Sequence, residues 1–278
     1  DFCLSRGLGD VYKRQGSSGA GVRYVMSAWI VPLAFAILVW WFSTGAILWL
    51  DGFSKKFFRP IFFASCVLLF FAFWGISISS TQDTVLGAYC AFTCAILIWG
   101  WQELAFLLGY ITGSRRLLCP ADAKGWQRAW FAFQTINHHE LALLVLGIVL
   151  AVLHVDAVNT TGLWAFVILW VMRQSAKINI FLGVLNLNER FLPDHLKYLQ
   201  TYFRRRAMNY LMPFSLVLAV VVVTPLWMDI FTATESAFAL TSKTLLATLL
   251  SLGILEHILL VLPFSSEGLW KWGFREGR

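Results

Sequence analysis

Two histidines and a glutamate, His138, His139 and Glu140, stand at the start of a long apolar run in QTINHHELALLVLGIVLAVLHV. Imidazole nitrogens and carboxylate oxygens are suitable ligands for iron, manganese or zinc. A single histidine can also ligate the metal of a haem or a chlorin, although a lone histidine carries little specificity. Ionisable groups inside apolar segments are costly and need a partner or a function.

Other apolar runs carry similar residues. Glu103 lies in GWQELAFLLGYITG. The stretch RQSAKINIFLGV begins with Arg173 and contains Lys177 and Asn179, and ILEHILLVLPF contains Glu256 and His257. Whether these groups meet depends on the elements that carry them.

The composition is that of a membrane protein. The chain has 278 residues, of which 59% are hydrophobic and 13% charged, and its mean hydropathy is +0.70. A soluble domain this apolar would expose large sticky patches. The net charge of +7 comes from residues in short loops rather than from a basic face, which argues against nucleic acid as a partner. The five cysteines show no zinc-finger or C-x-x-C spacing, and the Walker, G-x-S-x-G and H-E-x-x-H motifs are absent from the sequence.

Seven apolar runs are long enough to cross a bilayer as helices. The sequence therefore predicts an all-α, polytopic membrane helix bundle with seven transmembrane helices at 28–50, 58–79, 86–110, 133–155, 161–184, 210–230 and 241–263. We expect residues 26–278 to form a single seven-helix membrane domain. Residues 1–25 have neither an apolar stretch nor a helical period, and we interpret them as a non-native, adaptor-derived, disordered leader.

The loop charges predict an orientation. Lysine and arginine gather in or beside the connections 51–57, 111–132 and 185–209 and in the C-terminal tail. The alternate connections 80–85, 156–160 and 231–240 contain none. By the positive-inside rule, the N-terminus lies outside and the C-terminus is cytoplasmic. Within 185–209, the stretch after Pro193 predicts a short amphipathic helix on the membrane surface, with Leu196, Leu199 and Phe203 turned to lipid.

This orientation brings the polar residues of four helices to one depth. At about 1.5 Å per residue they lie roughly 8–10 Å inside the cytoplasmic boundary. One interpretation is a salt-bridged clamp, in which Lys177 or Arg173 neutralises a carboxylate. A second is a metal site with ligands from Glu103, His139, Glu140, Glu256 and His257. Its adjacent His-Glu pairs depart from the Glu-x-x-His spacing of di-metal bundles. A third is a cofactor, either a metal ion or a tetrapyrrole such as bacteriochlorophyll, held by His139, His257, Lys177 and Asn179.

Several stretches together resemble one family over residues 28–272. They are LVWWFSTGAIL, WGWQELAFLLGYITG, SAKINIFLGVLNLNERFLP, MNYLMPFS and LEHILLVLPF. They are similar to the photosynthetic complex assembly protein 2 (PuhE) family of anoxygenic phototrophic bacteria. The positions that match the polar motifs of that family are Glu103, His139, Glu140, Lys177, Asn179, Asn186, Asn188, Glu189, Glu256 and His257.

The resemblance implies a multi-pass protein of the bacterial inner membrane. Its implied role is the assembly of the photosynthetic reaction centre with its light-harvesting complex, and its implied partners are the subunits of these complexes or other assembly factors. No reaction follows from the resemblance, so no catalytic residue is carried over. The alternatives left open are a membrane metal-dependent, di-iron-like oxidoreductase that uses the same Glu/His layer, and a small transporter or proton pathway.

Overall fold

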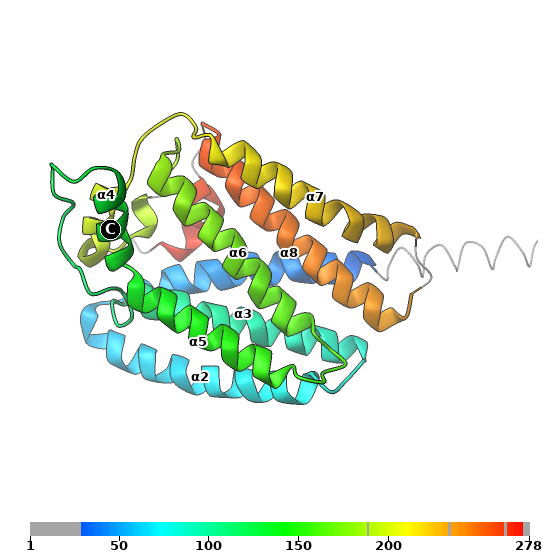
Figure 1. The fold of residues 1–278 in the computed structure, drawn as a ribbon. Helices are drawn as coiled ribbons and strands as arrows, with labels where there is room; N and C mark the ends of the chain where they lie inside the picture. The colour runs from blue at the N-terminus through cyan, green and yellow to red at the C-terminus, as the bar shows by residue number, and fades with distance from the viewer. Residues whose placement is uncertain (1–28, 188, 233–234, 264–265, 275–278) are drawn as a thin grey trace, which may run out of the picture.

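The computed structural model describes residues 29–187, 189–232, 235–263 and 266–274 (Figure 1). The predicted leader 1–25 and Asn188 lie outside these residues. The long helices are Trp29–Asp51 (the N-terminal helix), α2 Phe58–Ser79, α3 Val85–Leu107, α5 Asn137–Leu153, α6 Thr161–Leu182, α7 Leu211–Thr232 and α8 Ala237–Val261. The shorter elements are η1 Lys55–Phe57, α4 Gly125–Gln134, η2 Glu189–Phe191, η3 Asp194–Tyr202 and η4 Ser266–Gly273. The all-α prediction is confirmed for the described residues.

Six helices of the described chain are long and apolar enough to cross a membrane, and a seventh span results if α4 and α5 count as one. The two are bent by 64°, so the predicted span 133–155 is interrupted. The loop before α4 packs into this bend, where a Cβ added to Gly113 would lie 2.2 Å from the Gln134 carbonyl oxygen. The backbone N–H of His139 donates to the Thr112 carbonyl at 2.9 Å. The bend thus leaves α5 to begin at Asn137, close to the predicted polar layer.

Helices α3 and α8 form the centre of the bundle. In the most apolar 18-residue stretch of each of these helices, 56% of the residues are buried, against 11% in the corresponding stretch of Lys55–Ser79, which includes α2. Side-chain caps start both helices, because Thr84 accepts from the Gly87 N–H and Ser236 accepts from the Ala239 N–H. Helix α3 packs between α2 and α6, and α8 packs between α6 and α7 (Figure 1). The polar residues of α3 and α8 are therefore held inside the molecule.

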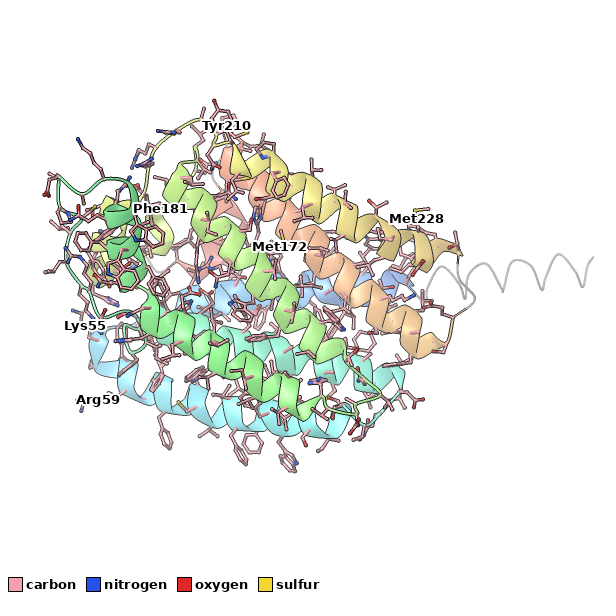
Figure 2. The ribbon with its side chains drawn as sticks, in the orientation of Figure 1. Lys55, Arg59, Met172, Phe181, Tyr210 and Met228 are labelled. Atoms are coloured by element: carbon pink, nitrogen blue, oxygen red, sulfur yellow. The ribbon has the colours of Figure 1, made fainter. Side chains whose placement is uncertain are left out.

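The connections predicted to be cytoplasmic gather at one end of the bundle. Figure 2 labels Lys55, Arg59 and Phe181 at this end and Met228 at the other. The N-terminal helix begins at the opposite end, and η4 returns to the end that carries α4 and η3 (Figure 1). The side of the membrane that this end faces stays a prediction.

The expected surface helix after Pro193 does not turn its apolar stripe to lipid. It forms the 3-10 helix η3, in which Leu196 and Leu199 are only 1% and 6% exposed. Both pack with Phe106, and Phe203 joins them at the edge. The prediction was wrong because the apolar stripe closes the end of the bundle instead. Burial also raises the pKa of the Tyr198 hydroxyl in the same segment.

Candidate functional site

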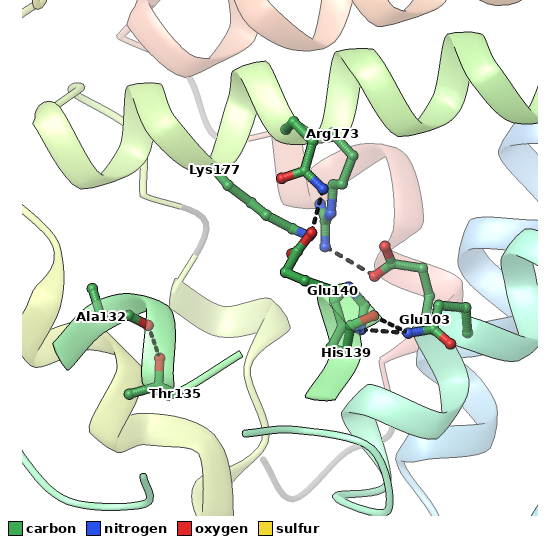
Figure 3. Close-up of polar contacts among 9 residues, drawn as sticks. Glu103, Ala132, Thr135, His139, Glu140, Arg173 and Lys177 are labelled. Carbon is green, nitrogen blue, oxygen red and sulfur yellow. Dashed lines mark hydrogen bonds and ion pairs between the residues drawn. The ribbon is translucent and has the colours of Figure 1, made fainter. Parts of the chain in front are cut away.

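Helix α6 directs two cations at the neighbouring helices α3 and α5 (Figure 3). Arg173 and Lys177 are four residues apart and so project from one side of the helix. Arg173 Nη2 lies 2.9 Å from Glu103 Oε2 of α3. Lys177 Nζ lies 2.5 Å from Glu140 Oε1 of α5. Two ion pairs therefore tie α6 to both helices.

The two carboxylates of these pairs are satisfied to different extents. Glu140 uses both oxygens, because Oε1 pairs with Lys177 and Oε2 accepts from Gln174 Nε2. It also lies in the first turn of α5, where the helix dipole favours an anion. Glu103 uses only Oε2, and its Oε1 is buried without a hydrogen-bond partner among the described residues. Such an unsatisfied acceptor is costly and rare in folded proteins.

A third carboxylate, Glu256 of α8, accepts a hydrogen bond from Trp40 Nε1 of the N-terminal helix at 2.9 Å. It lies within electrostatic reach of Arg173 and Glu103. Glu256 is deep in the bundle, yet its side chain is accessible, because it borders an internal cavity. The layer thus contains three carboxylates and two cations.

The two predicted histidine ligands are occupied by neighbouring polar groups. Gln102 Nε2 lies 2.9 Å from His139 Nδ1 and also donates to the His139 carbonyl. An amide nitrogen can only donate, so we assign Nδ1 as the acceptor and place the ring proton on Nε2. His257 Nδ1 donates to the Gly253 carbonyl, which leaves Nε2 to accept from Ser175 Oγ, both at 2.9 Å. With exposures of 2% and 1%, both rings are part of the packed core.

Three further predicted residues hold the backbone or a loop in place. Asn179 Nδ2 donates to the carbonyl one turn earlier in α6 at 2.9 Å. Asn186 Nδ2 donates to the Leu259 carbonyl of α8 at 2.8 Å. Glu189 accepts two hydrogen bonds from Arg205 Nη2, at 2.6 and 2.7 Å. These contacts give each residue a structural partner.

Sequence reasoning missed four partners of the layer, namely Gln102, Gln174, Trp40 and Ser175. Both amides stand next to a recognised charged residue in an apolar run, in WQEL and RQSA. Burying an amide without a hydrogen-bond partner is costly, so Gln102 and Gln174 could have been predicted as members of the layer. Trp40 gave no signal, because tryptophans are common near the ends of membrane spans.

A cavity of about 690 Å³ lies beside this layer, inside the bundle. Residues of the N-terminal helix, α3, α6 and α8 border it, and α4, η3 and Trp270 of η4 contribute at the loop end. The five acidic and basic side chains of the layer all border it: Glu103, Glu140, Arg173, Lys177 and Glu256. The rest of the wall is largely apolar and includes the aromatic residues Trp40, Trp99, Phe106, Phe133, Phe181, Phe191, Phe203 and Trp270.

The structure divides the predicted ligand sets. Of the four residues predicted to bind a cofactor, Lys177 borders the cavity, whereas His139, His257 and Asn179 do not. Among the described residues, no three histidine, cysteine, aspartate or glutamate side chains converge as a metal site. The metal site of Glu103, His139, Glu140, Glu256 and His257 therefore stays a prediction without a ligand cluster to support it.

The helices and this layer define a class of protein, a multi-pass membrane helix bundle with a centre of acidic and basic side chains beside a largely apolar cavity. The chain belongs to the family described as Protein of unknown function (DUF3623), whose family model matches residues 26–278. It is 38% identical over 248 residues to the "Uncharacterized 30.4 kDa protein in puhA 5'region" of Rhodobacter capsulatus. The match covers 88% of this chain and 90% of that relative. No solved structure matches the chain.

Proposed function

We propose that the protein is an integral membrane assembly factor for the photosynthetic reaction centre and its light-harvesting complex. The observation that carries this proposal is the relative named for the puhA 5' region, which matches this chain over almost its whole length. The family resemblance of LVWWFSTGAIL, SAKINIFLGVLNLNERFLP and the other stretches points to the same process. The proposed location is the bacterial inner membrane, with the basic loops and the C-terminus in the cytoplasm.

The geometry of the layer suits a protein that holds other components. Its two ion pairs fix α3, α5 and α6 around an apolar cavity. The two histidines are engaged in helix packing, in contacts with Gln102 and Ser175. Reaction-centre or light-harvesting subunits, or other assembly factors, are the proposed partners.

The experiment is a gene replacement in an anoxygenic phototroph that encodes this protein. Deletion should lower the reaction-centre absorbance per milligram of membrane protein, and the wild-type gene should restore it. Glu103→Ala and His257→Ala should each restore it only in part while the protein reaches the membrane at normal levels. Lys243→Ala is the matched control, since Lys243 pairs with Asp229 and Glu235 outside the layer.

Normal reaction-centre levels in the deletion strain would exclude the assembly role. Normal levels with both layer variants would instead limit the layer to a structural part. Metal analysis of the purified protein addresses the oxidoreductase alternative, because two iron atoms bound per chain would favour it over an assembly role without catalysis.

A further inference from the structure

We propose that the cavity binds a neutral, membrane-soluble molecule with a flat conjugated ring that carries both a hydrogen-bond donor and an acceptor. A quinol has this chemistry, because its hydroxyl groups donate and its ring oxygens accept. The proposal concerns what the protein binds and does not require the assembly role, so either can fail without the other.

The size and wall of the cavity favour such a ligand. Pockets for small molecules have volumes of roughly 300–1,000 Å³ and walls that are mostly apolar with a few polar groups. This cavity, at about 690 Å³, falls within that range. Trp40, Trp99 and Phe106 border it from two helices, and Trp270 and Phe191 border it near the loop end. Aromatic side chains on several sides offer stacking and edge contacts to a flat ring.

The polar groups that remain unused define the head of the ligand. Glu103 borders the cavity, and its buried Oε1 has no donor among the described residues. A rotation of the carboxylate would let this oxygen accept from a hydroxyl or N–H of the ligand. The Arg173 side chain keeps 45% of its accessible surface and borders the cavity. A guanidinium has five donors, and the described contacts of Arg173 include one bond to Glu103, so further donors can reach a ligand carbonyl.

The charges of the layer favour a neutral head over an ionised one. Glu140 and Lys177 neutralise each other, and Arg173 neutralises Glu103. Glu256, the third carboxylate, makes its described hydrogen bond to Trp40. The ligand head would contact the Glu103–Arg173 pair, where an anionic head would be repelled by Glu103 and a cationic head by Arg173. Because these interactions act in a low-dielectric interior, either net charge would be costly. A donor beside an acceptor on one uncharged ring fits both Glu103 and Arg173.

The test uses the full chain in nanodiscs of phosphatidylcholine and phosphatidylglycerol. Decylubiquinol is the ring probe with an outward donor. Methyl pyropheophorbide is a flat ring whose N–H groups face the centre of the macrocycle, and 1-hexadecanol is a lipid-soluble alcohol without a ring. Binding is followed by quenching of tryptophan fluorescence and by co-elution of the probe with the protein. Decylubiquinol should bind saturably, near one per chain, and an excess of hexadecanol should not displace it. Methyl pyropheophorbide should bind more weakly, and tighter binding of this ring than of decylubiquinol would overturn the proposed contact with Glu103.

Two variants locate the site. Gly100→Leu should abolish saturable binding, because a Cβ at Gly100 meets only Ile47 Cδ1 at 3.6 Å and a longer side chain can enter the cavity. Val145→Leu is its control, because Val145 lies on the outward face of α5 and is 51% exposed. Glu103→Gln should weaken binding about fivefold to tenfold, because a hydrogen bond to a carboxylate is replaced by a weaker one to a neutral amide oxygen.

Gel filtration and helical circular dichroism first verify that each variant folds. If Gly100→Leu does not fold, Glu103→Gln still tests the polar contact. Three further results would overturn the proposal: decylubiquinol does not bind saturably, hexadecanol displaces decylubiquinol, or folded Gly100→Leu and Glu103→Gln proteins bind decylubiquinol as the wild type does.

Discussion

Replacement of Lys177 by methionine should destabilise the folded protein more than removal of any outer charge. Methionine retains most of the apolar stem, so the main change is the loss of the ammonium group. Glu140 would then remain in the bundle with Gln174 as its described partner. The Glu140 carboxylate would stay as buried as before, but it would lack the positive charge of Lys177 beside it.

The size of the effect follows from the burial of the pair. Removing one partner of a fully buried ion pair costs about 3–5 kcal/mol. Here the Lys177 and Glu140 side chains keep 21% and 17% of their accessible surface, so the remaining charge is partly solvated. Gln174 also continues to donate to Glu140. We therefore expect the free energy of unfolding to fall by about 2–3 kcal/mol.

The assay is reversible unfolding in bicelles, applied as a double-mutant cycle. Lys177→Met, Glu140→Gln and the double variant are compared with the wild type. The double variant should be more stable than the sum of the single effects predicts, by about 1–2 kcal/mol, because it leaves no charge unpaired. Lys243→Met is the control and should cost about 1 kcal/mol or less, since Asp229 in its pair is 55% exposed. Equal losses for Lys177→Met and Lys243→Met would refute this reasoning.

Three further changes test other contacts. Trp40→Phe removes the indole donor of Glu256 and should lower the free energy of unfolding by about 1–2 kcal/mol in the same assay. Gly45→Ala should detach η4, because the added Cβ would lie 2.0 Å from Trp272 Cζ2, and faster tryptic cleavage after Lys271 would report it. Tyr198→Phe should reduce the alkaline loss of stability. Burial raises the pKa of Tyr198 above its ordinary value of 10.0, so the folded state holds the proton more tightly and loses stability as the pH rises beyond that value. Matched melts at pH 8 and about pH 11 would measure the difference.

The spans could be predicted because bilayer thickness imposes a length and a composition on each helix. The helix Trp29–Asp51, α2 and α8 lie within a few residues of their predicted ranges. The break before α5 could not be predicted, because QTINHHE contains neither proline nor glycine. It depends on Thr112 and Gly113, which belong to a loop more than 20 residues earlier.

That charged residues of α3, α5 and α6 lie at one level and meet was predictable, but their rotation about each helix was not. Adjacent helical residues diverge by about 100°, so a pair such as Glu256-His257 cannot direct both side chains to the same partner. The structure sends Glu256 towards Trp40 and His257 towards Ser175. These directions depend on packing with the N-terminal helix and α6, and no local pattern in ILEHILLVLPF encodes that packing.

The same division occurs twice, and it assigns different roles to the two residue types. In both adjacent pairs the carboxylate borders the cavity, while the histidine is buried between helices. The histidines therefore determine how the helices pack, and the carboxylates determine the polarity of the space between them. The two cations of α6 differ in the same way. Lys177 is largely buried against a fully bonded Glu140, whereas Arg173 is half accessible beside a carboxylate that keeps one free acceptor. Stability should depend mainly on Lys177, and the chemistry offered to a ligand should depend mainly on Arg173 and Glu103.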